Sequence, residues 1–491
     1  MMSTAPVSSA QRDSILETRS IDYVPRAERH GKVWHQGPFW FAGNFVLPTL
    51  VTGFIGPVLG LSVGWSILAV VLGAGIGTFF MAFHANQGPR MGLPQMIQSR
   101  AQFGRRGVIV PFTATVFVYV GFLVFDVILA TQGLQLVLPG NKLVWYPILI
   151  TVSIVIAVIG HDLLHFIQRW LTGLLVAVFS IITVLAIVNY SGVGAALATD
   201  ETTLGWNTTA FLVQFSLAAG YNISYAVYVS DYTRYLPQNV SAPKLITWVY
   251  VGAAGSAIWL MSLGALLAAN IPNADAIGAV KEVGDTLFPG FGTFAVLLSV
   301  VALLSIMGVN AYGAMLTGTS AVDGFKRVRP TQGLRVIGLS AVGLLTLLIA
   351  LLIPDAYLGS FTDFVIMMLY FLVPWTAVNL VDFYLVRHGK YAIAEIFTPK
   401  GIYGNWAWRG VTAYLIGFVA MIPFFYTSFY VGPAAAALGG ADLSFVVGLL
   451  VSGVLYYVFS GNLDLRAEDV ARAASERTLE GTGHAVGERS D

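Results

Sequence analysis

The sequence contains no cysteine, which excludes disulfide bonds, iron–sulfur clusters and thiolate chemistry from the function of this chain. Charged residues are also scarce: they make up 10% of the 491 residues, against about a quarter in soluble globular proteins. The formal net charge of +1 argues against a polyanion such as nucleic acid as a partner. No P-loop motif occurs, so the sequence predicts no ATP hydrolysis by this chain.

Hydrophobic residues, by contrast, make up 56% of the chain, and there are 52 glycines, as in closely packed membrane helices. A spanning helix needs about twenty mostly apolar residues. Twelve stretches meet or approach this length: 38–61, 65–84, 108–137, 145–160, 168–190, 208–228, 245–269, 290–318, 336–353, 361–386, 411–431 and 442–460. We therefore expect an all-α integral membrane protein with about twelve transmembrane helices.

The two ends of the chain are polar. Residues 1–35 contain no apolar core of a signal peptide, and residues 462–491 predict a short helix followed by disorder. If both ends are cytoplasmic, only Lys142 and Lys281 of the 26 lysines and arginines fall on the opposite side. This charge asymmetry predicts a multi-pass protein of a bacterial-type inner (plasma) membrane with both termini in the cytoplasm.

Three polar residues stand inside predicted spans. Asp126 lies deep in the third span with no basic residue nearby in sequence, so it must meet a cation, a substrate N–H group or a proton. Its alternative role is a structural carboxyl bonded to a neighbouring helix. Asn44 and Asn310 lie beside glycines in the first and eighth spans, and each either binds substrate or joins two helices.

Two spans carry residues that interrupt helices. The first, with Pro48 and Pro57, reads FVLPTLVTGFIGPVLG, and the sixth reads SLAAGYNISYAVYVSDYTRYLP. Broken helices at corresponding places in two halves indicate the binding site of a secondary transporter. If spans one to five and six to ten are inverted repeats, the third and eighth spans also correspond. The polar residues Asp126 and Asn310 would then face one site.

Four stretches, in the right order, resemble the nucleobase–cation symport family of cytosine, purine, allantoin, uracil and hydantoin permeases. They are GPFWFAGNFVLPTLVTG, GLPQMIQSRAQFGRRGVIVPF, VSDYTRYLP and DFYLVRHGKY with FTPKGIYGNWAWRGV, and they span residues 36–430. The resemblance implies a five-plus-five inverted-repeat core over residues 36–390 that works by alternating access. It also implies a cytoplasmic loop at 391–410, two accessory helices within 411–461, and cytoplasmic tails at 1–35 and 462–491.

The family binds a flat ring between aromatic side chains and reads the ring's edge with amides. The resemblance places the third-span aromatic at Phe122 and the neighbouring polar position at Asp126, where the family usually has Asn or Gln. It places the eighth-span amide at Asn310. In the sixth span the resemblance places the aromatic position at Tyr221, Asn222 or Tyr225. In the first span it places the polar position at Val46, for which Asn44 is the substitute.

A sodium site is implied in the same way. Its ligands would be the carbonyls of Ala42, Phe45, Val301 and Leu304 and the hydroxyl of Ser305. Carbonyls and one hydroxyl suit a hard monovalent cation at an unwound helix. A buried serine that bonds its own helix carbonyl is the alternative for Ser305.

The resulting hypothesis is not an enzyme but a symporter of a nucleobase or related nitrogen heterocycle, coupled to Na⁺ or H⁺. The ring would lie between Phe122 and a sixth-span tyrosine, with Asp126 and Asn310 at its edge. Asp126 would bind an amidine-like edge, carry the coupling proton, or pair with a cationic substrate such as a vitamin amine. An amino-acid transporter, a passive facilitator and a ligand sensor remain alternatives. We expect no cofactor beyond the coupling ion, and no obligatory partner beyond the substrate and the lipid bilayer.

Overall fold

The structure is a computed structural model that describes residues 22–159, 161–189, 205–271, 275–326, 328, 331–398 and 401–481. The described chain is helical. Its longer helices are α1 (Gln36–Asn44), α2 (Leu47–Val58), α3 (Val63–Ala85), α7 (Ile109–Gln135), α8 (Lys142–Ile159), α9 (His161–Val188), α11 (Thr208–Ile223), α13 (Ala242–Asn270), α14 (Ala276–Asp285), α15 (Phe291–Asp323), α16 (Gln332–Leu352), α17 (Leu358–Val381), α18 (Trp408–Met421), α20 (Ser444–Ser460) and α21 (Leu465–Gly481). Short helices are η3 (Val33–His35), α4 (Gln87–Met91), α5 (Gln95–Gln98), α6 (Arg100–Phe103), η4 (Ser224–Val227), α12 (Val229–Thr233), η5 (Asp382–Val386), η6 (Ile393–Ile396) and α19 (Pro433–Ala437).

Nine of the twelve predicted spans each coincide with one long helix. The first corresponds to α1 and α2 together, the sixth to α11 and η4, and α18 covers only the first half of the eleventh, 411–431. In the described chain, eight helices are long and apolar enough to cross a membrane, and two bent pairs raise this number to ten. The helices α8 and α18 are apolar but shorter. The all-helical, membrane-spanning fold is confirmed, while the exact number of twelve crossings stays a prediction.

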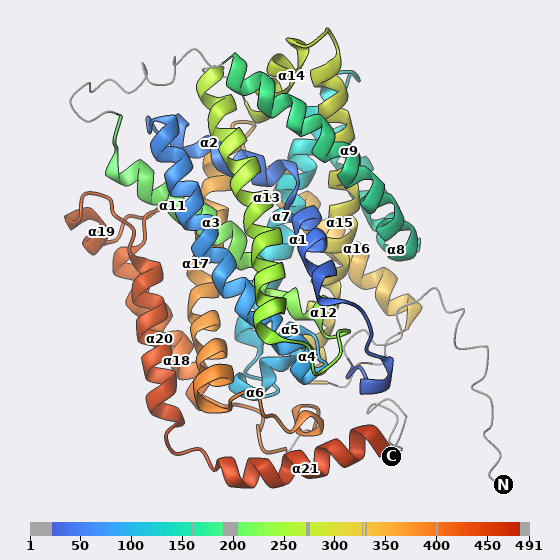
Figure 1. Cartoon of the computed structure of the whole chain (residues 1–491), viewed down its shortest axis with the longest axis vertical. Coiled ribbons are helices and arrows are strands. Elements are labelled where there is room, and N and C mark those ends of the chain that lie inside the picture. Colours follow the sequence, from blue (N-terminus) through green and yellow to red (C-terminus); the bar gives the residue numbers. More distant parts are fainter. Residues whose placement is uncertain are drawn as a thin grey trace, which may run out of the picture.

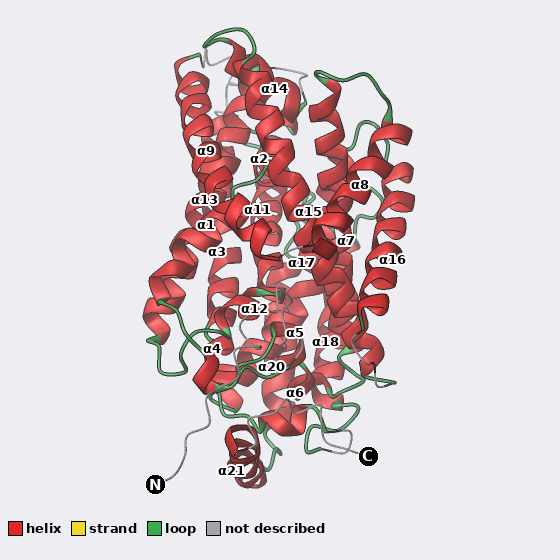
Figure 2. Ribbon diagram, turned by 90° about the vertical axis from the view of Figure 1, so that its right-hand side faces the viewer, coloured by secondary structure: helices red, strands yellow, loops and turns green. Residues whose placement is uncertain are grey.

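The long helices run roughly along one axis of the molecule, as Figures 1 and 2 show. The helices α4, α5 and α6 gather toward one end of this axis, and α14 lies at the other. The last helix, α21, turns by 88° from α20 and lies across the first of these ends. We call this end, where α4 and α21 lie, the α21 end.

The first span breaks between α1 and α2, and the direction of the helix bends by 62° at this break. The break lies at Phe45 and Val46, where the backbone leaves the helical region (φ −92°, ψ 66° and φ −137°, ψ 161°). It therefore precedes the prolines that suggested it. Pro48 stands in the first turn of α2, where its missing N–H costs nothing, and Pro57 stands just before the last residue of that helix.

Glycines allow both halves of the broken helix to lie against α13. A Cβ atom added to Gly252 would collide with the backbone of Gly37 in α1, and one added to Gly264 would collide with the Leu50 carbonyl in α2. The reverse also holds: a Cβ atom added to Gly53 in α2 would collide with the Met261 carbonyl in α13. Backbone therefore meets backbone along this crossing, as in other membrane helix pairs with small residues at the contact.

The sixth span also breaks. Helix α11 tightens into η4 at Ser224, and the backbone leaves the helical region at Tyr228 (φ −138°, ψ 6°) before α12 begins. Both predicted interruptions therefore exist, and each comes within a few residues of an aromatic side chain in the central cavity described below.

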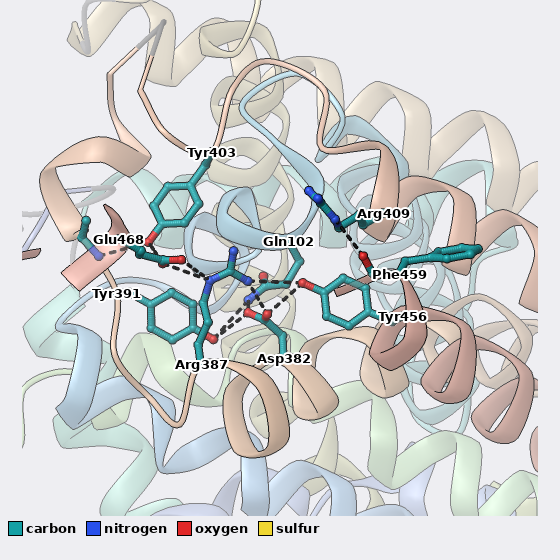
Figure 3. A network of polar contacts seen from close by, with 10 residues as sticks. Gln102, Asp382, Arg387, Tyr391, Tyr403, Arg409, Tyr456, Phe459 and Glu468 are labelled. Carbon is teal, nitrogen blue, oxygen red and sulfur yellow. Dashed lines mark hydrogen bonds and ion pairs between the residues drawn. The ribbon is translucent and has the colours of Figure 1, made fainter. Parts of the chain in front are cut away.

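The two helices after the tenth span, α18 and α20, pack against each other and against α17. The amphipathic helix α21 then reaches the loop that follows α17. Arg387 of this loop bonds Glu468 of α21 through Nε (2.9 Å) and forms an ion pair with Asp382 of η5 (Figure 3). Tyr403 donates to Glu468 (2.5 Å) and Tyr456 donates to Asp382 (2.8 Å), so the C-terminal segment is joined to the tenth span. The division into core and accessory helices stays a prediction.

Candidate functional site

A cavity of about 840 Å³ lies between the broken first span, α7, α9, the sixth-span break and α15. Its walls are rich in aromatic side chains, and no lysine or arginine is among the described residues that line it. Of the predicted substrate and ion residues, those lining it are Ala42, Phe45, Val46, Phe122, Asp126, Tyr221, Tyr225 and Asn310. The cavity extends to Trp34 and His35 in η3, and Trp34 is 49% exposed.

Asp126 and Asn310 meet in this cavity although 184 residues separate them. Asp126 on α7 is 1% exposed and Asn310 on α15 is 8% exposed, and the Asn310 Nδ2 atom lies 3.5 Å from Asp126 Oδ2. A hydrogen bond of this length is at the limit of useful geometry. Within the described chain, no cation pairs with the Asp126 carboxyl. A buried carboxyl with so little compensation requires a proton or a ligand.

One of the predicted aromatic pairs, Phe122 with Tyr221, does not form an open slot in this conformation. The ring of Phe122 meets that of Tyr221 edge to face, with centroids 5.4 Å apart and an interplanar angle of 85°. A flat ring sandwiched between two others needs about 7 Å between them, because each stacked pair is separated by roughly 3.5 Å. A heterocycle can therefore stack on one face of either side chain, but it cannot lie between Phe122 and Tyr221 without a movement of one of them.

Sequence reasoning missed six aromatic residues that line the cavity: Trp34, Phe39, Trp40, Tyr119, Tyr228 and Tyr232. The ring of Tyr228 lies nearly parallel to those of Trp40 and Tyr119, with centroids 6.1 and 5.6 Å away and interplanar angles of 29° and 22°. Trp40 comes from α1, Tyr119 from α7 and Tyr228 from the sixth-span break. The break itself was the signal for Tyr228. No local pattern distinguishes Trp40 or Tyr119 from other membrane aromatics.

The hydrogen-bonding groups of Asn44 are fully used by neighbouring helices. Its Nδ2 donates to Asn222 Oδ1 (3.0 Å) and to the Ala253 carbonyl (2.9 Å). Its Oδ1 accepts from Tyr225 Oη and Thr49 Oγ1, both at 3.1 Å. These bonds join α1, α11 and α13 at the break, and neither Asn44 nor Asn222 lines the cavity. The helix-joining alternative therefore accounts for every contact of Asn44.

The predicted ion ligands lie on the two expected helices. Ala42 and Phe45 stand at the end of α1, while Val301, Leu304 and Ser305 stand on α15. Ser305 is 4% exposed, and its hydroxyl has no hydrogen-bond partner among the described residues. By contrast, Ser299 of the same helix bonds the Ala295 carbonyl at 2.8 Å. The alternative in which Ser305 bonds its own helix is therefore not observed, and its oxygen is available to a cation.

Comparison with known proteins identifies the family of this chain. A family model described as permeases for cytosine/purines, uracil, thiamine and allantoin matches residues 23–448. The chain is 39% identical over 451 residues to a putative purine-cytosine permease of Bacillus subtilis. The aligned residues cover 90% of this chain and 95% of that protein. It is 24% identical to a purine-cytosine permease of Saccharomyces cerevisiae, over 90% of this chain and 85% of that protein.

A similar solved structure is that of a nucleobase-cation-symport family transporter in a closed conformation with bromovinylhydantoin bound. It superposes with a TM-score of 0.70 at 18% identity, over 95% of this chain and 100% of that chain. At this identity the likeness shows a shared fold. The all-helical transporter fold that the family resemblance implied is thereby confirmed.

Proposed function

Because the chain belongs to the family of permeases for cytosine/purines, uracil, thiamine and allantoin, we propose that it is a secondary active transporter of a nucleobase or related nitrogen heterocycle. Uptake would be by symport with Na⁺ or H⁺ through alternating access. The family resemblance seen in the sequence is confirmed, and the relatives are permeases rather than enzymes. The substrate, the coupling ion and the residue roles below are the proposal.

The observation that carries the proposal is that Asp126 and Asn310 meet in an aromatic cavity whose described lining residues include no lysine or arginine. A carboxylate accepts two N–H bonds from an amidine-like ring edge, while the amide of Asn310 can both donate and accept. The aromatic walls offer faces on which a planar heterocycle can stack. This combination favours a flat ring that presents N–H donors at its edge, such as cytosine, adenine or guanine.

The test replaces Asp126 with asparagine, which keeps the shape and removes the charge. Uptake of labelled cytosine, adenine and guanine into proteoliposomes should fall about 10- to 100-fold, since charge-assisted bonds contribute roughly 1.5–3 kcal/mol each. Asp355→Asn is the control, because Asp355 is 89% exposed in its side chain and pairs only with Lys142 among the described residues.

Two results separate the roles of Asp126. If it binds the substrate edge, Asp126→Asn weakens binding itself, measured by thermal shift on the purified protein. If it carries the coupling proton, binding persists while the dependence of uptake on external pH disappears. Unchanged uptake together with an unchanged pH dependence would exclude both roles.

We infer that Ser305 supports a sodium site together with the carbonyls of Ala42, Phe45, Val301 and Leu304. The unpartnered buried hydroxyl on α15 supports this assignment. Ser305→Ala should then abolish the stimulation of uptake by sodium, and Ser299→Ala should leave it intact because that hydroxyl bonds its own helix. Equal uptake in sodium-free buffer by the unmodified protein would rule out sodium coupling and leave the proton as the coupling ion.

A cationic substrate, such as a vitamin amine, is the second candidate. It is favoured by the same cavity, because a lone carboxylate among aromatic rings attracts a positive charge. Competition of uptake by neutral purines against quaternary or protonated amines distinguishes the two. A passive facilitator predicts no accumulation against a gradient and no effect of ionophores.

We also propose that both termini lie in the cytoplasm, as the distribution of basic residues predicts. The α21 end is then cytoplasmic. Because the cavity reaches the half-exposed Trp34 ahead of α1, this conformation would be open to the cytoplasm. Cysteine accessibility from each side of the membrane tests the orientation directly, since the natural chain contains no cysteine.

A further inference from the structure

A second cavity, of about 520 Å³, lies at the α21 end and shares no lining residue with the central cavity. Four separate parts of the chain form most of its wall: the segment before η3, the end of α3 with α4, the loop from η5 to η6, and α21. Its polar and charged lining residues are Tyr23, Arg26, Asn86, Arg90, Gln238, Tyr384, His388, Lys390, Tyr391, Arg472 and Glu476. The proposed transport site uses none of them.

The charge in this second cavity is strongly positive. Four cations, Arg26, Arg90, Lys390 and Arg472, face one carboxylate, Glu476, so the balance is 4 − 1 = +3 with histidine neutral. Arg26 and Arg472 each lie 3.5 Å from Glu476, and Arg472 also lies 3.3 Å from Asp469, which is not a lining residue. Arg90 and Lys390 form no ion pair with any described residue. The cavity therefore holds two cations whose charge its own walls leave uncompensated.

Two further features belong to the wall of this cavity. Asn86 is 6% exposed and lines it, and its Nδ2 atom donates to the hydroxyl of Tyr384, another lining residue, at 3.4 Å. His388 is exposed, also lines the cavity, and is the single described non-glycine residue with a positive φ (52°). Such a backbone conformation is costly and concentrates at functional sites. The Nδ1 atom of His388 lies 2.8 Å from the carbonyl oxygen of Tyr384, and this hydrogen bond holds the ring in place.

The position of α21 completes the cavity. Glu468, Arg472 and Glu476 follow one another at four-residue intervals, so they lie along one face of the helix. The buried bonds of Glu468 to Arg387 and Tyr403 attach this face to the loop after α17 (Figure 3). Burial, together with the nearby Glu468, raises the pKa of the Tyr403 hydroxyl, which therefore stays protonated as the donor. Arg472 and Glu476 are thereby placed in the cavity wall.

We propose that this second cavity binds the phosphate group of an anionic ligand. Arginine and lysine side chains converging from different chain segments provide the charge-assisted bonds that a phosphate requires. The ligand would connect α4, the η5–η6 loop and α21. Its source is either a soluble phosphate compound or the headgroup of an anionic lipid, since both present the same phosphate oxygens to the basic side chains.

The experiment uses the purified full-length protein. In neutral detergent at constant ionic strength, inorganic phosphate is titrated while the unfolding temperature is followed, with chloride as the reference anion. In parallel, the protein is placed in nanodiscs of phosphatidylcholine with and without phosphatidic acid. Arg90→Gln and Lys390→Gln should each weaken the phosphate effect about ten-fold or more, while their unfolding temperatures without phosphate stay unchanged because both side chains are exposed.

The matched control is Lys326→Gln, which removes an exposed cation that does not line the cavity. Stabilisation by phosphate that depends on Arg90 and Lys390 supports the proposal with a soluble ligand. Stabilisation by phosphatidic acid alone, with the same dependence, supports it with a lipid headgroup. The proposal is overturned if neither probe stabilises the protein, or if Lys326→Gln weakens the effect as much as the two cavity variants do. None of these readouts depends on transport.

Discussion

Replacing Gly264 with alanine should force the broken first span away from α13. The new Cβ atom would approach the Leu50 carbonyl oxygen of α2 more closely than the 3.0 Å below which real Cβ contacts essentially never fall. Both groups belong to helix backbone or are attached directly to it, so no side-chain rotation relieves the overlap. The two helices must therefore separate, and the start of α2 beside Val46 must move with them.

The size of the effect follows from two opposing contributions. Inserting a methyl group into a packed interface costs about 1–3 kcal/mol. Alanine favours a helix over glycine by about 1 kcal/mol, which offsets part of that cost. The net expectation for Gly264→Ala is a loss of about 0–2 kcal/mol in the free energy of unfolding, and a difference of about 1–3 kcal/mol from a glycine-to-alanine change that meets no neighbour. Affinity for substrate should fall as well, because Val46 lines the central cavity.

The control is Gly255→Ala in the same helix, where an added Cβ atom meets nothing within 4 Å. This variant gains the helix preference without the collision, so it should be as stable as the natural protein or slightly more stable. Thermal unfolding in detergent and uptake kinetics in proteoliposomes measure both consequences. If Gly264→Ala matches Gly255→Ala in stability and affinity, the close backbone crossing is not what holds α2 in place.

Two other substitutions test buried polar contacts. Arg387→Gln leaves Asp382 and Glu468 buried without their cation, so it should lower the unfolding free energy by about 3–5 kcal/mol; Arg466→Gln, on the exposed part of α21, should not. Gln214→Leu removes the side chain that bonds two backbone groups of α2 at 2.6 and 3.0 Å, which should cost about 1–3 kcal/mol in the same assay. Unfolding temperatures equal to that of the natural protein would contradict either expectation.

The helices, the apolar spans and the candidates Asp126 and Asn310 could all be predicted from the sequence. Hydropathy is a local property, since each span carries its own apolar residues and the bilayer requires them. An ionisable residue inside such a span is conspicuous for the same reason. The correspondence of the third and eighth spans even predicted that these two residues share a site, and the structure places them 3.5 Å apart.

Other features depended on contacts between distant segments, which local patterns do not encode. The first span breaks at Phe45 and Val46 rather than at its prolines. Directly before this break, α11 and α13 supply hydrogen-bond acceptors to Asn44. Trp40 and Tyr119 reach the central cavity because their helices converge there.

The phosphate-binding cavity proposed at the α21 end likewise exists only because α21 folds back on the loop after α17. From its own residues, the sequence determined a bilayer-spanning helical protein with a polar pair in its interior. The tertiary structure decided which of its polar groups are already bonded to neighbouring helices and which remain available to a substrate or an ion.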